Sequence, residues 1–108
     1  MANFNQRERG FEAKYTFDLE QNFRIEACLY KMLARWAGGK MGLSDAESAA
    51  FANQVVGDVV ADPKSKGIAA ALLAEFGSRN IDMTVSELNA KLAELEPLAR
   101  VEVLGPQD

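Results

Sequence analysis

Residues 7–37 read RERGFEAKYTFDLEQNFRIEACLYKMLARWA, and this stretch decides the fold around which the rest of the chain is organised. Its apolar residues recur every three or four positions without an interrupting proline, which predicts a helix. Early in the helix, Phe4, Phe11 and Tyr15 share one narrow arc, whereas from Phe23 onward apolar side chains occupy nearly the whole circumference. A narrow stripe suits a helix lying in one groove, and a wide one suits a helix buried in a bundle. The pattern therefore predicts one helix with two roles.

The next part of the chain contains the signals for a second and a third helix. Gly38-Gly39 is expected to end the long helix, because glycine readily adopts the left-handed conformation of a helix C-terminus. The residues Ser44-Asp45-Ala46-Glu47 form a capping box, which predicts a second helix that continues to about Ala61. Asp62-Pro63 then predicts the cap and the first residue of a third helix.

The third helix is expected to stop near Gly77–Asn80, and Thr84-Val85-Ser86-Glu87 predicts the start of a fourth. Pro97 should limit the regular part of that helix, because proline lacks the N–H that a helix interior uses. The predicted apolar positions of these three helices are Ala49, Phe51, Ala52, Val55, Val56, Val59, Val60, Ile68, Leu72, Leu73, Phe76, Val85, Leu88, Leu92 and Leu95.

Four helices with short loops and no period-two alternation predict an all-α protein, a small and mostly up-and-down four-helix bundle. A long helix of this kind spans roughly 48 Å and helices of about 15 residues span roughly 22 Å, so three short helices cannot cover the long one. Its N-terminal half must project, fold back or be disordered in the free chain, and disorder before about Leu19 is our expectation because isolated helices are marginal in water. We predict a partner-binding segment in residues 1–18, a bundle in residues 19–100 and a flexible tail in residues 101–108.

The composition argues against most catalytic, metal and nucleic-acid chemistry. The chain has no histidine and one cysteine, Cys28, which removes an intrachain disulfide, the usual zinc sites and cysteine–histidine catalysis. A net charge of −4 is unlike the basic footprint of a nucleic-acid binder. No stretch has the apolar length of a spanning helix, which predicts a cytoplasmic protein without direct membrane insertion. We expect a protein that is not an enzyme and has no cofactor or metal.

Aromatic and charged side chains of the N-terminal half are the candidate binding residues. Charges of both signs beside aromatic rings suit a protein groove with complementary charges, whereas binding to a membrane surface would need a basic face. A merely solvated charged helix is the alternative. The candidate partner-binding residues are Phe4, Arg7, Glu8, Arg9, Phe11, Glu12, Lys14 and Tyr15.

The pattern carried by the long helix is similar to that of a known family. Its residues here are Arg7-Glu8-Arg9-Gly10-Phe11-Glu12-Ala13-Lys14-Tyr15, Asp18, Glu20, Phe23, Glu26-Ala27, Lys31, Leu33 and Trp36-Ala37. They resemble the zeta subunit of alphaproteobacterial F-type ATP synthases, the inhibitor of ATP hydrolysis, densely over residues 4–37 and more thinly beyond. The chain departs from the family at Cys28-Leu29-Tyr30, where a basic pair and an asparagine are usual, and this implies a repacked bundle face or weaker inhibition.

The resemblance implies a four-helix protein whose N-terminal segment inserts at a catalytic alpha–beta interface of the ATP synthase head and reaches towards the gamma subunit of the rotor. By the same resemblance, the eight candidate residues above are its contacts, and the protein is cytoplasmic and peripheral to the inner membrane through the ATP synthase. Two other functions remain open from the residues alone. One is a helical adaptor that docks a different partner through the same segment, and the other is a ligand-binding or enzymatic bundle, which would need a polar pocket in its core.

Overall fold

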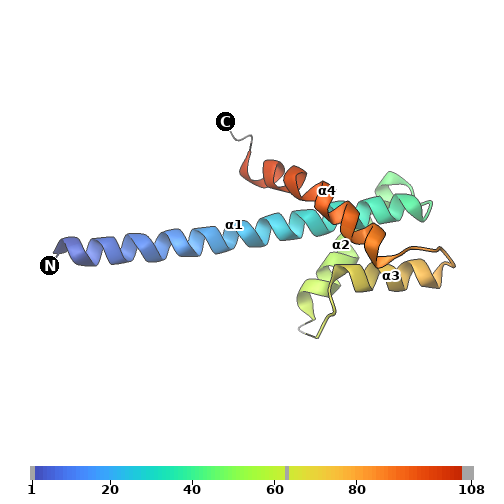
Figure 1. Cartoon of the computed structure of the whole chain (residues 1–108), viewed down its shortest axis with the longest axis horizontal. Helices are drawn as coiled ribbons and strands as arrows, with labels where there is room; N and C mark the ends of the chain where they lie inside the picture. Colours follow the sequence, from blue (N-terminus) through green and yellow to red (C-terminus); the bar gives the residue numbers. More distant parts are fainter. Residues whose placement is uncertain (1, 63, 106–108) are drawn as a thin grey trace.

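The computed structural model describes the backbone of residues 2–62 and 64–105 and the side chains of residues 19–62 and 64–105. This part of the chain forms four helices and no strand: α1 (Ala2–Lys40), α2 (Asp45–Ala61), α3 (Ile68–Ser78) and α4 (Val85–Leu104). The helices alternate in direction along the molecule (Figure 1). The prediction of an all-α, four-helix protein is therefore confirmed.

Helix α1 is continuous over 39 residues, which corresponds to a length of about 58 Å. Its N-terminal half extends away from the other three helices (Figure 1). The molecule consequently measures 65 × 35 × 26 Å, with a radius of gyration of 17.7 Å. A compact chain of this length would have a radius of about 13 Å. Of the three arrangements that the length mismatch allows, the structure has the projecting one.

The C-terminal half of α1 is the central element of the bundle. It packs mainly against α2 and α4, while α3 closes the remaining side against all three. Four large side chains are completely buried where the helices meet: Leu33, Leu72, Phe76 and Leu88. The smaller Ala34, Ala37 and Ala52 are also buried and allow the helix backbones to approach each other. The broad apolar arc predicted for this half of α1 is thus the core-forming surface.

The end of α1 differs from the prediction that Gly38-Gly39 terminates the helix. Both glycines are helical, and the left-handed residue is Gly42, with a φ of +84°. The Leu43 N–H donates to the Gly38 carbonyl at 3.0 Å and the Gly42 N–H to the Gly39 carbonyl at 3.1 Å, which is a Schellman motif. Gly38 is instead the point where α1 lies against the buried Ser48 of α2, so its missing Cβ serves packing.

Two further boundaries were predicted wrongly. Helix α3 begins after Gly67, whose φ is +103°, and not at Asp62-Pro63. Asp62 caps the end of α2, and its carboxylate accepts a hydrogen bond from the Lys64 N–H at 2.9 Å. Helix α4 continues through Pro97 to Leu104, so residues 101–104 are helical and do not belong to an irregular tail.

Both predicted capping boxes are confirmed. The Glu47 N–H donates to the Ser44 hydroxyl and the Ser44 N–H donates to the Glu47 carboxylate, each at 3.2 Å. Thr84 and Glu87 form the same reciprocal pair at 3.1 and 3.3 Å. The hydrogen bonds from Ser44 lower the pKa of Glu47 from its ordinary value. These local interactions fix where α2 and α4 begin.

The predicted core faces are correct in outline, with errors at their edges. Ala52, Val55, Val56, Ile68, Leu72, Phe76, Leu88 and Leu95 are buried as expected. Val60 and Val85 are about half exposed, and Leu92 is only partly buried against the core. Ser48, which apolar periodicity passes over, is buried because it contacts Gly38.

Candidate functional site

The eight sequence-predicted binding residues, Phe4 to Tyr15, all lie on the projecting half of α1 (Figure 1). Their side chains lie outside the residues whose side chains the structure describes, so their contacts stay a prediction. The structure does describe the backbone of these residues, which belongs to the same continuous helix that enters the bundle. Residues four apart on such a helix lie about 6 Å apart along its axis and nearly above one another.

The side chains where α1 enters the bundle are described, and two of them are exposed and apolar. Leu19 is 52% and Phe23 58% exposed, whereas the first buried side chain of α1 within the described residues is Ile25, at 6%. The sequence predicts that the broad apolar arc of the bundle half begins at Phe23, and for Phe23 this is wrong because its side chain is exposed. Phe23 continues the four-residue spacing of Phe11, Tyr15 and Leu19. That regular series could have identified Phe23 as part of the same apolar stripe.

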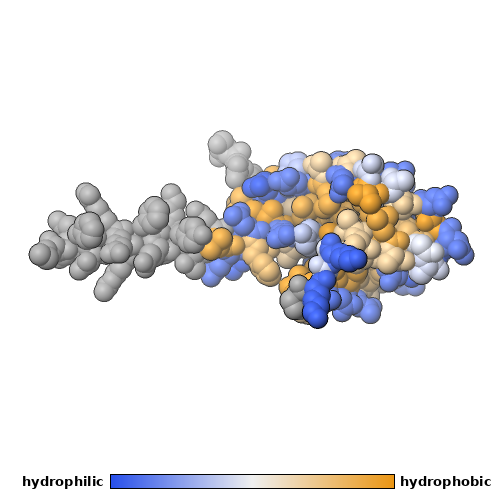
Figure 2. All heavy atoms as spheres, turned by 60° about the horizontal axis from the view of Figure 1, so that its bottom comes forward, coloured by the Kyte–Doolittle hydropathy of each residue, from blue (hydrophilic) through white to orange (hydrophobic). Residues whose placement is uncertain are grey.

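A neighbouring apolar residue comes from α2. Val60 is 53% exposed, and it lines a surface hollow of about 270 Å³ together with Phe23, Ala27 and Tyr30 of α1. Hydrophobic surface is visible where the projecting helix meets the bundle (Figure 2). Two elements therefore contribute exposed apolar side chains at the base of the projecting helix.

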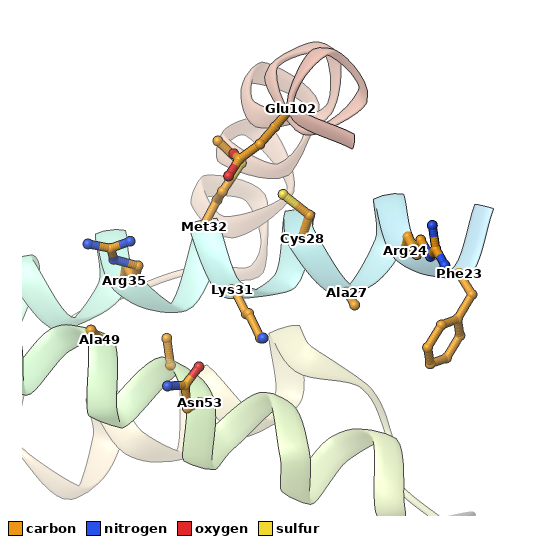
Figure 3. A pocket seen from close by; sticks show the side chains of 11 residues that line it. Phe23, Arg24, Ala27, Cys28, Lys31, Met32, Arg35, Ala49, Asn53 and Glu102 are labelled. Carbon is orange, nitrogen blue, oxygen red and sulfur yellow. The ribbon is translucent and has the colours of Figure 1, made fainter. Parts of the chain in front are cut away.

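A larger groove of about 580 Å³ runs along the same half of α1, between α2 and the end of α4. It contains Arg24, Lys31 and Arg35, which form no ion pair with any residue whose side chain is described. Lys31 points towards the Asn53 side of the groove, whereas Cys28 and Met32 point towards α4 (Figure 3). The groove is an open surface feature, and the described core is apolar apart from Ser48. It does not provide the polar core pocket that a ligand-binding or enzymatic bundle would need.

The departure from the family pattern, Cys28-Leu29-Tyr30, lies within the bundle. Leu29 and Tyr30 pack against the core, and the Tyr30 hydroxyl donates a hydrogen bond to Glu26. This bond, together with burial, raises the pKa of Tyr30 to about 12. Burial and the nearby Glu102 carboxylate raise the pKa of the Cys28 thiol, which keeps it protonated and poorly nucleophilic. The three residues therefore lie in the bundle, away from the projecting half of α1.

Neither metal binding nor membrane spanning has support in the described chain. Among the side chains of residues 19–62 and 64–105, His, Cys, Asp and Glu nowhere gather in a group of three that could hold an ion. Over the same residues, no helix combines the length and the apolar character needed to cross a membrane.

A small helical bundle that presents one long helix, with exposed apolar residues at its base, belongs to the class of proteins that act by binding another protein. The comparison with known families makes this specific: the family model of the ATPase inhibitor subunit zeta matches residues 1–102. The chain belongs to the ATPase inhibitor subunit zeta family, and the resemblance found in its sequence is confirmed. Membership indicates a regulatory subunit that binds the ATP synthase. The searches of curated proteins and of solved structures found no significant match.

Proposed function

We propose that this protein blocks ATP hydrolysis by the F-type ATP synthase by inserting the projecting half of α1 at a catalytic alpha–beta interface near the gamma subunit. The observation that carries the proposal is the mismatch between α1 and the bundle: 39 residues form one helix, whose N-terminal half extends away from the other helices while its second half packs against them (Figure 1). Family membership supplies the target enzyme. On this proposal, the protein is peripheral to the inner membrane on its cytoplasmic side, through the ATP synthase.

The dimensions of the molecule support insertion of the helix alone. A helix with its side chains is about 10–12 Å wide, so it fits a groove between two subunits. The bundle is much wider, since the two shorter dimensions of the molecule are 35 and 26 Å. The bundle therefore stays outside the groove and limits insertion to residues 2–18, which extend about 26 Å. Aromatic anchors would supply most of the binding energy, and the charges of both signs between them would fix the register.

Deletion of residues 1–18 tests the proposal. The bundle should stay folded, because the described core residue nearest the N-terminus is Ile25. Inhibition of ATP hydrolysis should be lost, because the deletion removes every predicted anchor. Substitution of Phe11 and Tyr15 by alanine should weaken inhibition less severely. The assay is ATP hydrolysis by an ATP synthase depleted of its zeta subunit.

The unmodified chain is the positive control, and circular dichroism confirms that each variant remains helical. Inhibition by the truncated chain equal to that of the intact chain would show that residues 1–18 are not the inhibitory segment. If the intact chain binds a different protein and leaves ATP hydrolysis unaffected, the adaptor function replaces the proposed one.

A further inference from the structure

We propose that the surface of this protein that binds the ATP synthase does not end at residue 18 but continues onto the bundle through Leu19, Phe23 and Val60, here called the shoulder patch. The inference rests on the proposed function, because it assigns the same partner to both surfaces. It adds three residues, one of them on a different helix, to the eight that the sequence predicts.

The geometry of α1 provides the first argument. Leu19 and Phe23 follow Tyr15 at successive four-residue steps on one continuous helix, so they lie about 6 and 12 Å further along its axis. Each step also rotates the stripe by about 40°. The edge of a partner groove that encloses the helix as far as Tyr15 would therefore lie close enough to contact Leu19. The next apolar residue of the stripe, Phe23, lies beside Val60 of α2, where they line one hollow.

The exposure of these side chains provides the second argument. All three are more than half exposed, and the described part of the chain offers no element that covers them. Phe23 also lines three separate surface hollows. These are the groove of about 580 Å³ between α2 and the end of α4, the hollow that includes Val60, and a hollow shared with Leu19 and Glu20. An aromatic ring among concave surfaces can be enclosed from several sides, which is the setting in which a single side chain dominates an interface.

The charges around the patch indicate the chemistry of its partner. Glu20, Glu26 and Asp62 line the two smaller hollows, with Arg24 as the one basic residue among the residues that line them. The third hollow that Phe23 lines adds Lys31 and Arg35, so the rim of the patch carries charges of both signs. Such a rim lacks the uniformly basic face that an anionic membrane surface requires and suits a protein surface with complementary charges. We assign this partner as the outer edge of the groove in the ATP synthase head that would receive residues 1–18.

The test compares Phe23→Ala, Leu19→Ala and Val60→Ala in the hydrolysis assay. Val85→Ala is the matched control, since Val85 is 51% exposed, lies at the start of α4 and is not among the residues that line the three hollows around Phe23. Phe23→Ala should raise the half-inhibitory concentration roughly tenfold or more, as truncation of an interface anchor does. Val60→Ala should raise it less, and Val85→Ala should leave it unchanged. A photo-crosslinking Phe23→p-benzoylphenylalanine variant should crosslink to an alpha or beta subunit.

Failure of the inference can be told apart from failure of the proposed function. If Phe23→Ala and Val60→Ala inhibit like the intact chain while the Phe11 and Tyr15 double variant does not, the shoulder patch is refuted and the inhibitory segment stands. If Phe23→Ala changes only the sedimentation of the free protein, a second copy of the chain covers the patch and the inference is wrong. If the intact chain does not inhibit, both proposals fall.

Discussion

Two adjacent glycines at the end of α1 should respond in opposite ways to the same substitution. A Cβ added at Gly38 would lie 2.7 Å from the Ser48 Oγ, 3.0 Å from its Cβ and 3.2 Å from its Cα. The hydroxyl could rotate away, but the Cβ and Cα move only if α2 moves. A Cβ added at Gly39 would meet nothing within 4 Å. Gly38→Ala should therefore destabilise the protein and Gly39→Ala should not.

The magnitudes follow from two opposing effects. Replacement of glycine by alanine inside a helix stabilises it by up to about 1 kcal/mol, and this gain applies to both variants. Overpacking of a close contact costs about 1–3 kcal/mol, and this cost applies to Gly38→Ala alone. The free energies of unfolding of the two variants should therefore differ by about 1–3 kcal/mol. For a domain of this size, each kcal/mol corresponds to about 4–8 °C in melting temperature.

Urea denaturation followed by far-ultraviolet circular dichroism measures this difference directly. A double-mutant cycle identifies its origin, because Ser48→Gly removes the two side-chain atoms that a Cβ added at Gly38 would strike. In that background, most of the difference between Gly38→Ala and Gly39→Ala should disappear, and only the 3.2 Å approach to the Cα of residue 48 should remain. If Gly38→Ala were as stable as Gly39→Ala in the unaltered background, α1 and α2 would not cross as closely as described, and the packing role of Gly38 would be wrong.

Four further outcomes are expected. Thr84→Ala should cost about 0.5–2 kcal/mol of unfolding free energy through loss of the α4 cap, and an unchanged urea midpoint would contradict this. Leu88→Ala should cost about 2–5 kcal/mol, because the side chain is fully buried. With the other tyrosine replaced by phenylalanine, Tyr30 absorbance should titrate near pH 12, and Glu26→Gln should move the midpoint towards 10. Since this pKa lies above the unfolded value of about 10, the hydrogen bond to Glu26 stabilises the fold below pH 10, and its contribution is lost between about 10 and 12. Asn22→Pro, but not Asn22→Ala, should weaken inhibition by up to about a hundredfold while the bundle stays folded, and equal inhibition would refute the need for a continuous helix.

The features that the sequence predicts correctly depend on residues close together in the chain. The capping boxes at Ser44 and Thr84 need only residues three positions apart. The apolar stripes of α3 and α4 need only helical periodicity. By contrast, Gly38 resembles a helix terminator until Ser48 of α2 is placed against it. A Gly-Gly pair alone cannot distinguish a helix end from a close helix crossing.

Other errors arose from local signals that suit two structures. Asp62-Pro63 can begin a helix, yet the next four residues, Lys64 to Gly67, have no apolar side chain to hold a helix on the core, and the backbone turns instead. For the candidate site, the sequence indicates the stripe up to Tyr15. It cannot show that Phe23 is exposed or that Val60 lies beside it, because both facts depend on where α2 leaves α1 uncovered.

The joining of the binding segment and the bundle in one helix has an energetic consequence. Formation of the first turn is the costly step in helix formation, and an isolated helix of about 17 residues is therefore marginal in water. The second half of α1 is held by tertiary packing around Leu33, so extension towards the N-terminus needs only propagation from an existing helix. Less conformational entropy is then lost when the segment enters its groove, and more of the anchor energy remains for affinity. The bundle thus acts as the nucleus of the binding helix and also as the body that stays outside the enzyme. For this reason, a break in the helix at Asn22 should weaken inhibition even when every proposed contact residue is unchanged.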